Sequence, residues 1–378
     1  MSASLSPSLR RRTLYVLLIV GPALAIVNGA VGGAYGQKTT AVDSIARAFK
    51  AETHTPGLVV GTLTDGLSHV STYGVASLRD STRLDADTRF AIGSVTKAFT
   101  GLLLAEMARE GTVSLDARIG SFLPDSVRMP IVDGHPIRLR HLATHTSGLP
   151  RLPSNLSPIQ NRANPYADYS PAKLHAFLNK VELSAPPGST FTYSNVGTGL
   201  LGHLLARHAD TTYAALMTDR VLAPLGLHDT AVPSPADTSA PHLATGYTRM
   251  GPAAYWSFDA LAGAGALRST AGDLLQFLRV HLSPTRTSLA AALRQTHRVR
   301  HQSESLGLTL SWHVSEGPDG SRLYWHNGGT GGFRSFVGFD RQANRAVVVL
   351  ANQALSLRRF NQFAFRVVRA LAQKGTES

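Results

Sequence analysis

The stretch FAIGSVTKAFTGLLL, residues 90–104, decides the fold of this chain. A short apolar run leads into a Gly-Ser step, and apolar residues then recur at three- and four-residue spacing, a pattern that predicts a buried amphipathic helix. Ser94 stands where that helix starts and Lys97 follows one turn later, so both side chains lie on one face. A Ser-x-x-Lys pair at a helix start is a known nucleophile arrangement.

A purely structural role would also explain this pair. Ser94 could cap the helix, and Lys97 could extend its ammonium group into solvent. The chain holds a second Ser-x-x-Lys at residues 170–173, where Ser-Pro is the pattern of an ordinary helix start. Ser94 differs because it follows a strand-like run and opens an apolar helix. We therefore expect Lys97 to be buried, with a lowered pKa that suits a base.

The composition excludes several kinds of site. The chain has 378 residues and no cysteine, so it can form no disulfide, thiol nucleophile or thiolate metal site. Its formal charge of +13 is carried mainly by arginines scattered along the sequence, which does not indicate a nucleic-acid-binding surface. We expect no nucleic-acid partner. The hydrophobic fraction of 43% is ordinary for a globular protein, and the length allows one large domain or two.

The N-terminus has the features of a secretory signal peptide. Three arginines at 10–12 precede an apolar run over 14–27, and small residues follow up to Gly36. We expect residues 1–36 to be a signal peptide and the mature protein to be secreted or periplasmic. The alternative is an uncleaved anchor that tethers the protein to a membrane, although the apolar run is short for a span.

The order of predicted elements gives the fold class. Strand-like runs come first, helices dominate the middle, and strands with a final helix return at the end. The simplest assembly is an α/β (α+β) fold: one antiparallel sheet built from both chain ends and flanked by helices, with an inserted mainly helical domain. We expect the sheet domain to comprise residues 37–90 and 260–378. The helical domain, which carries Ser94, would comprise residues 91–259.

Individual elements follow from their periodicities. Helical spacing predicts helices over 41–49, 171–181, 197–208, 213–221, 271–281 and 360–371. Runs rich in β-forming residues predict strands over 57–64, 68–75, 308–314, 322–326, 333–339 and 346–351, and a small hairpin over 129–139.

Two further polar stretches accompany the Ser94 helix. Tyr193-Ser194-Asn195 lies between an extended run and a helix start, so Tyr193 and Asn195 project to one side, although a helix N-cap is the plain alternative. His326-Asn327-Gly328-Gly329 follows a strand, and its glycines indicate tight backbone geometry or close approach of a ligand. An ordinary glycine loop is the alternative there. The absence of a Gly-Lys-Ser/Thr ending argues against a nucleotide phosphate site.

A zinc site is not expected at His141 and His145. Their spacing matches that of zinc hydrolases, but Leu142 stands where those enzymes carry a glutamate, and no third ligand is in view. We therefore predict no metal.

The three motifs, in order, resemble those of the serine β-lactamase and penicillin-binding protein superfamily. They are Ser94-Val95-Thr96-Lys97, Tyr193-Ser194-Asn195 and His326-Asn327-Gly328, and the likeness covers residues 41–370. It is closer to class C β-lactamases, DD-carboxypeptidases with a Tyr-Ser-Asn motif, and related esterases and D-aminopeptidases. The resemblance implies a β-lactamase/transpeptidase-like fold and a serine hydrolase that acts through an acyl-enzyme on amide or ester bonds, with no cofactor.

The resemblance also implies a role for each matching position. Ser94 would attack a carbonyl, and Lys97 and Tyr193 would move its proton to the leaving group. Asn195 would bind the substrate amide and hold Lys97. The backbone N–H groups of Ser94 and Gly329 would form the oxyanion hole. Lysine and tyrosine have ordinary pKa values near 10, so the surroundings would have to lower the pKa of any group that acts as the base at neutral pH.

One departure from the lactamase pattern bears on the substrate. Class C lactamases usually carry Lys-Thr-Gly where this chain has His326-Asn327-Gly328, and histidine is mostly neutral at pH 7. Arg334 is a candidate for the missing charge, and an outward-facing Arg334 is the alternative. The resemblance thus favours a peptidase or esterase over an efficient lactamase, and we first expect a DD-carboxypeptidase/β-lactamase-related peptidase acting on a small molecule or peptide. A carboxylesterase or D-aminopeptidase of the same fold is the alternative, and a catalytically silent penicillin-binding-like protein is a further one. We expect specificity to lie in the rim segments 151–169 and 244–258.

Overall fold

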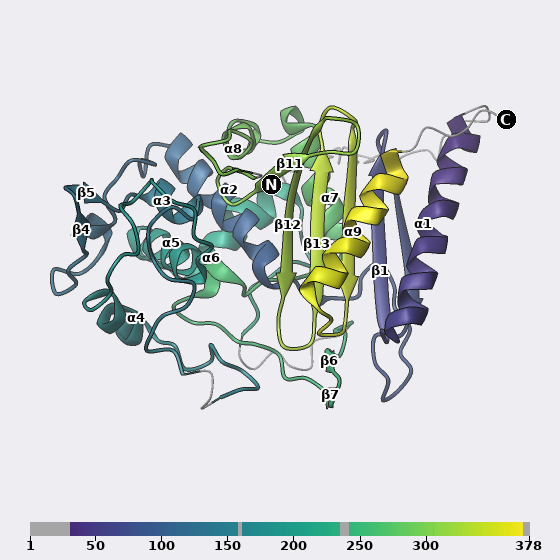
Figure 1. Cartoon of the computed structure of the whole chain (residues 1–378), viewed down its shortest axis with the longest axis horizontal. Coiled ribbons are helices and arrows are strands. Elements are labelled where there is room, and N and C mark those ends of the chain that lie inside the picture. The colour runs from purple at the N-terminus through teal and green to yellow at the C-terminus, as the bar shows by residue number, and fades with distance from the viewer. Residues whose placement is uncertain (1–30, 158–160, 235–241, 305, 373–378) are drawn as a thin grey trace, which may run out of the picture.

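The computed structural model describes residues 31–157, 161–234, 242–304 and 306–372. Within them, an eight-stranded antiparallel sheet lies beside a mainly helical part (Figure 1). The sheet strands are β1 (Gly57–Thr64), β2 (Leu67–Gly74), β9 (His301–Gln302), β10 (Gly307–Leu308), β11 (His313–Glu316), β12 (Arg322–Gly329), β13 (Arg334–Asp340) and β14 (Arg345–Ala351). Their order, β2-β1-β14-β13-β12-β11-β10-β9, joins strands from both chain ends. The predicted fold class is therefore confirmed.

Helices cover both faces of this sheet. The described helices are α1 (Val31–Thr53), α2 (Thr96–Arg109), α3 (Leu139–Ala143), α4 (Pro171–Leu178), α5 (Asn195–His208), α6 (Tyr213–Met217), α7 (Ala271–Leu282), α8 (Ala290–Thr296) and α9 (Leu357–Ala372). Successive residues of a strand point to opposite faces. Leu58 accordingly packs in the cluster under α1 and α9, whereas Val59 packs in the cluster that includes α7. Because both faces are covered, β1 and β14 are buried along their whole length.

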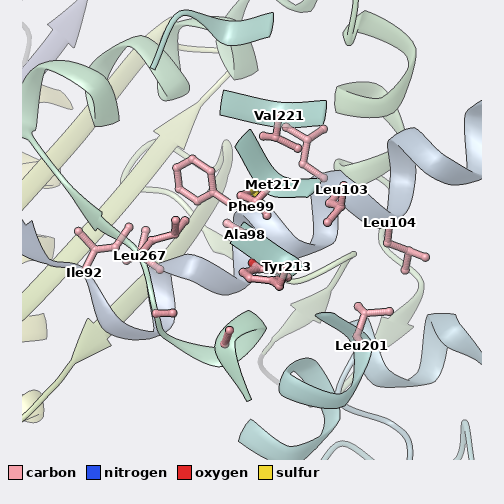
Figure 2. Close-up of a cluster of buried hydrophobic side chains, with 14 of the residues drawn as sticks. Ile92, Ala98, Phe99, Leu103, Leu104, Leu201, Tyr213, Met217, Val221 and Leu267 are labelled. Carbon is pink, nitrogen blue, oxygen red and sulfur yellow. The ribbon is translucent and has the colours of Figure 1, made fainter. Parts of the chain in front are cut away.

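Helix α2 is buried on all sides rather than on one. Its residues from Thr96 to Met107 are buried, because the helical part packs on one flank and α7 on the other. Phe99 stacks on Phe277 of α7 with ring centroids 3.9 Å apart. Figure 2 shows the side chains of α2 among those of α5, α6 and the residues that follow α6. The helix that carries Lys97 and directly follows Ser94 is thus packed within the core of the molecule.

Short pairs of strands complete the fold. They are β3 (Phe90–Ala91) with β8 (Arg268–Ser269), β4 (Ile131–Val132) with β5 (His135–Pro136), and β6 (Tyr247–Thr248) with β7 (Gly251–Pro252). The β4–β5 pair is the small hairpin predicted over 129–139. The β3–β8 pair links the start of the predicted helical domain to the segment in which the chain has returned to the predicted sheet domain. The boundaries of the two domains remain a prediction.

Two predicted elements are interrupted in the structure. The strand expected over 308–314 is interrupted after Leu308, because Ser311 takes a left-handed conformation (φ 73°) and the Trp312 N–H donates to Thr309 Oγ1 at 3.1 Å. The helix expected over 213–221 ends as α6 at Met217 and continues as one π-helical turn to Leu222.

The N-terminal prediction falls mostly outside the described residues. Residues 1–30 of the predicted signal peptide lie there, and residues 31–36 form the start of α1, which extends well beyond the helix expected over 41–49. In the part of the chain that the structure describes, no helix is both long and apolar enough to cross a membrane.

Candidate active site

Ser94 lies in a 3₁₀ turn, Gly93–Val95, directly before α2. The N-cap position of α2 belongs to Val95, so the capping alternative for Ser94 is wrong. The Ser94 hydroxyl instead lies 3.0 Å from Nζ of Lys97. The side chains of this Ser-x-x-Lys pair are therefore in direct hydrogen-bond contact, as their helical spacing predicted.

The backbone on both sides of Ser94 is clamped between strands. The Ile92 N–H donates to Leu267 O at 3.1 Å, and the Ser335 hydroxyl donates to Ile92 O at 2.6 Å. A side chain has no room where this turn meets the end of β12. A Cβ atom on Gly93 (φ 50°) would lie 2.8 Å from the Gly329 nitrogen. The predicted oxyanion donors therefore come from two backbone segments in close contact.

The Gly329 N–H points toward that turn. In the β12–β13 ladder the Thr330 N–H donates to Phe333 O at 3.2 Å. Hydrogen-bonded and non-bonded positions alternate along an antiparallel ladder, so the Gly329 N–H faces away from β13 and toward Gly93.

Lys97 is completely buried, with an exposed fraction of 0%. Its Nζ also donates to Ala264 O at 2.6 Å. Burial, and secondarily the positive charge of Arg151, hold the pKa of Lys97 well below its usual value. Loss of hydration disfavours the ammonium form, and a neutral amine has a free lone pair for a proton. The prediction that Lys97 is buried, with a lowered pKa, is confirmed.

Tyr193 shows the opposite shift. Burial raises the pKa of Tyr193 to about 12, and the hydrogen bond to Ser94 and the charge of Arg151 oppose this only in part. Two basic side chains flank its ring: Lys97 Nζ lies 5.2 Å from the ring centroid and the Arg151 guanidinium carbon 5.0 Å. The condition for Tyr193 to serve as a base, a lowered pKa, is therefore not met.

Asn195 does not hold Lys97, contrary to the prediction. Its Nδ2 donates to the Tyr166 hydroxyl at 3.1 Å, and its backbone N–H donates to Arg151 O at 2.9 Å. Its Oδ1 is buried and has no hydrogen-bond partner among the described residues. The contact expected from Asn195 is made by Ala264 O, which leaves the Asn195 amide oxygen available to a substrate N–H.

His326 is buried beside the Tyr193 ring. It has an exposed fraction of 0%, and its ring centroid lies 6.3 Å from that of Tyr193. Its Nδ1 lies 2.6 Å from Asn327 O, while Nε2 has no partner in the described part of the chain. Burial holds the pKa of His326 well below its usual value, so the ring is neutral where class C lactamases usually carry a lysine.

The two candidate cations for a substrate carboxylate differ sharply. Arg334 is held against the backbone, because its Nε donates to Leu355 O at 2.6 Å and its Nη1 donates to Thr330 O and Phe333 O at 3.0 and 2.7 Å. Arg151 is exposed, and no acidic side chain among the described residues pairs with it. From the sequence, Arg334 was the candidate for the charge that binds a carboxylate, and Arg151 was expected only as part of the rim segment 151–169.

Comparison with known proteins agrees with this geometry. The family described as Beta-lactamase matches residues 42–371. The chain belongs to the beta-lactamase family. Membership indicates a serine hydrolase, which is the predicted class of enzyme.

Curated relatives carry two kinds of name. A "Beta-lactamase" of Lysobacter lactamgenus is 27% identical over 348 residues, covering 82% of this chain and 86% of that protein. The "D-alanyl-D-alanine-carboxypeptidase/endopeptidase AmpH" of Escherichia coli K12 is 26% identical over 298 residues, covering 75% of each.

Solved structures share the fold. One titled "A class C beta-lactamase" superposes with a TM-score of 0.78 at 21% identity, covering 90% of this chain and 97% of that one. A "Beta-Lactamase/D-Alanine Carboxypeptidase" from Pseudomonas syringae gives 0.77 at 24% identity, covering 88% and 98%.

The rim of this beta-lactamase-family site is aromatic. Tyr166, the partner of Asn195, stacks on Phe258 with ring centroids 4.7 Å apart and lies 5.5 Å from the Trp256 ring. Asn164 and Ser257 join the same two segments through two hydrogen bonds of 2.9 Å. The segments expected to form the rim, 151–169 and 244–258, therefore contact each other next to Asn195; residues 158–160 lie outside the described residues.

Two more histidines, His145 and His313, surround Tyr193. Their ring centroids lie 4.5 and 6.2 Å from that of Tyr193, and His313 stacks on His326 at 5.0 Å. Burial lowers the pKa of both rings, to about 4 for His313. Sequence reasoning weighed His145 only as a zinc ligand and did not single out His313. The available signal was that His313 lies in the strand predicted over 308–314, which comes directly before the strand predicted over 322–326 that ends at His326.

The geometry does not support a zinc site at His141 and His145. α3 ends at Ala143, and His145 has a left-handed backbone (φ 57°), so His141 and His145 do not share a helix face. Across the described residues, no cluster of three or more potential ligand side chains could hold a metal ion.

Proposed function

We propose that this chain is a hydrolase that cleaves amide or ester bonds of peptide-like substrates through an acyl-enzyme on Ser94, as a relative of the DD-carboxypeptidases and β-lactamases. One observation carries the proposal: the fully buried Nζ of Lys97, with its lowered pKa, lies 3.0 Å from the partly exposed hydroxyl of Ser94. A neutral amine at that distance can remove the hydroxyl proton as the oxygen attacks.

Lys97, not Tyr193, is the base for acylation in this proposal. With a pKa of about 12, only about one Tyr193 in 10⁵ would be ionised at pH 7. Lys97 takes the proton of Ser94, and the Ser94 oxygen bonds to the substrate carbonyl carbon. The resulting oxyanion accepts hydrogen bonds from the N–H groups of Ser94 and Gly329. Such donors are typically worth about 3–4 kcal/mol to the transition state.

Collapse of that intermediate needs a proton on the leaving group. Tyr193 donates its phenolic proton to the departing nitrogen or oxygen as the bond to the carbonyl carbon breaks. The Lys97 ammonium then returns a proton to Tyr193, so both groups regain their starting states. Hydrolysis of the acyl-enzyme follows with water in place of the leaving group: the base accepts a proton from water, and Ser94 leaves protonated.

The exposed Arg151 favours substrates with a carboxylate near the scissile bond. It is the described cation that lies over the Tyr193 ring without an acidic partner, whereas Arg334 is engaged with three carbonyl oxygens. A D-alanyl peptide and a β-lactam both carry such a carboxylate. The neutral His326 favours a second candidate, an esterase for uncharged acyl groups, because position 326 then offers no charge to a substrate.

Intact-mass spectrometry with benzylpenicillin tests the proposal. We expect a mass increase equal to that of the drug on the wild type and none on Ser94→Ala. A lasting adduct indicates a carboxypeptidase-like enzyme, and penicillin loss without an adduct indicates a lactamase. Reaction with chromogenic acyl esters alone indicates the esterase. If no acyl substrate and no serine-directed phosphonate labels Ser94, the proposal is wrong and a binding-only protein is indicated.

We also propose that the protein acts outside the cytoplasm. The support is the sequence of residues 1–36, with three arginines, a short apolar run and small residues. Mass spectrometry of the N-terminus of protein from its native host tests this. A chain beginning near residue 37 agrees with secretion, and an intact N-terminus in the membrane fraction indicates an anchor.

A further inference from the structure

His145 holds the Tyr193 segment from both sides. The Thr192 N–H, just before Tyr193, donates to the backbone oxygen of His145 at 2.8 Å. The Ser194 N–H, just after it, donates to Nδ1 of the His145 ring at 3.2 Å. The ring itself packs against the tyrosine ring, with centroids 4.5 Å apart and planes 33° from parallel. One residue therefore binds the chain before, at and after the phenol.

The ring can make this contact in one protonation state only. Nδ1 accepts the Ser194 N–H, so it carries no proton, and the ring proton of the neutral form lies on Nε2. The ring is buried to 2% exposure, and burial beside Lys97 lowers its pKa, which favours the neutral form. The left-handed backbone of His145 (φ 57°) directs its carbonyl and its ring to the same segment.

The attachments on the two sides of Tyr193 are unequal. After Tyr193, Ser194 is also fixed by α5, because its hydroxyl accepts the Gly197 N–H at 2.8 Å and donates to Pro150 O at 2.6 Å. Before Tyr193, the backbone bond of Thr192 goes to His145. Movement of His145 would therefore move the tyrosine, while the start of α5 would stay in place.

We propose that His145 is a positioning residue that holds the Tyr193 hydroxyl at Ser94 for proton transfer. The role rests on the proposed acyl-transfer function, in which Tyr193 donates to the leaving group. Displacement of a catalytic group by about 1 Å can cost on the order of 100-fold in rate. Because His145 does not touch the substrate in this role, its loss should lower kcat and leave KM nearly unchanged.

His141 provides a matched control four residues earlier. Its Nδ1 also accepts a backbone N–H at 3.2 Å, from Arg138, and its ring is nearly as buried. That bond caps the short helix α3 and does not involve the Tyr193 segment. Replacing either histidine by alanine removes a buried ring and one ring-to-backbone hydrogen bond. At position 145 alanine must also adopt the left-handed backbone, a cost that His145→Asn avoids.

The kinetic test compares His145→Ala, His145→Asn and His141→Ala with the wild type on one chromogenic ester. We expect kcat to fall about 100-fold in His145→Ala with KM within about threefold. Asparagine can adopt a left-handed backbone and offers an acceptor oxygen near the position of Nδ1, so His145→Asn should recover kcat to within about fivefold. His141→Ala should keep the wild-type kcat. A wild-type kcat in His145→Ala, or no recovery in His145→Asn, would overturn the proposal.

Hydrogen exchange followed by mass spectrometry provides a readout that does not need turnover. Peptides covering residues 191–196 should exchange faster in His145→Ala than in the wild type, and His145→Asn should restore protection. Unchanged exchange in His145→Ala would overturn the proposal even if no substrate were found. An inactive wild type with the expected exchange pattern would instead count against the proposed function alone. If His145→Ala does not fold, His145→Asn against His141→Ala decides by the same two readouts.

Discussion

Removing the positive charge of Arg151 should shift the pH dependence of acylation. The base must be neutral to act, so activity should rise as pH increases through the pKa of Lys97. Arg151 is one of the two causes that lower this pKa. Arg151→Ala should therefore raise the pKa of Lys97 and move the acidic limb of the profile to higher pH.

The size of the shift follows from the geometry. Nζ of Lys97 lies 5.2 Å from the centroid of the Tyr193 ring and the guanidinium carbon of Arg151 lies 5.0 Å from it, so the two cations are at most about 10 Å apart. Arg151 is exposed, so water screens most of its field. At an effective dielectric constant of about 40–80, Coulomb's law gives a shift of roughly 0.3–0.6 pH unit.

The assay is kcat/KM for an uncharged chromogenic ester between about pH 5 and 10, because this ratio reports groups of the free enzyme. Arg151→Lys, which keeps the charge, should leave the limb in place, and 1 M salt should shrink the effect of Arg151→Ala. Tyr193→Phe should be slow but keep the limb, since Lys97 is the base. A limb that disappears in Tyr193→Phe, or moves to lower pH in Arg151→Ala, would refute the assignment of the base.

Further predictions concern Ser94, substrate binding by Arg151, and two glycines. Ser94→Ala should abolish turnover and covalent labelling while the melting temperature stays near the wild-type value, as measured by intact mass and thermal unfolding. Arg151→Ala should raise KM for a carboxylate-bearing peptide about 10- to 100-fold and leave KM for a neutral ester unchanged, since a hydrogen bond to a charged group is worth about 1.5–3 kcal/mol. Gly328→Ala would place a Cβ atom 2.1 Å from Ile92 O, so it should cost about 1–3 kcal/mol in the free energy of unfolding, measured by urea titration, and at least about 100-fold in activity. Gly272→Ala, where the nearest atom lies 3.7 Å away, should be neutral in both assays.

The nucleophile pair and the sheet could be predicted because each depends on local spacing. Ser94 and Lys97 are three residues apart at a helix start, and that spacing alone brings Nζ to the hydroxyl. The fully apolar run at 346–351 predicts a strand covered on both faces, and β14 is buried throughout. Such inferences need no knowledge of which distant segments come together.

The histidine surroundings of Tyr193 could be predicted only in part, because they converge from separate elements. His145 follows α3, whereas His313 and His326 come from β11 and β12. The left-handed Ser311 breaks the strand expected over 308–314, and His313, after the break, pairs with Trp325. Sequence periodicity carries no information about a single residue with φ of 73°. The contact between His313 and His326 therefore could not be derived from periodicity.

The direction of the Tyr193 pKa shift could not be predicted from the sequence, for a related reason. Lysine and tyrosine have similar ordinary pKa values, but burial acts on them in opposite directions because it always disfavours the charged form. It lowers the pKa of Lys97 and raises that of Tyr193. The order of basicity therefore depends on which side chains are buried together, and this depends on the packing of α2 against the segment that carries Tyr193.

In the proposed mechanism, one arginine links substrate recognition to basicity. With a neutral His326, the cation that lowers the pKa of Lys97 and the cation offered to a substrate carboxylate are both Arg151. A carboxylate bound to Arg151 compensates its charge, so the pKa of Lys97 in the complex rises above that in the free enzyme. A neutral ester leaves the charge of Arg151 unpaired and produces no such rise. A lysine at position 326 would add a second permanent cation and weaken this dependence on Arg151. With histidine at position 326, the exposed Arg151 both binds the substrate carboxylate and lowers the pKa of Lys97.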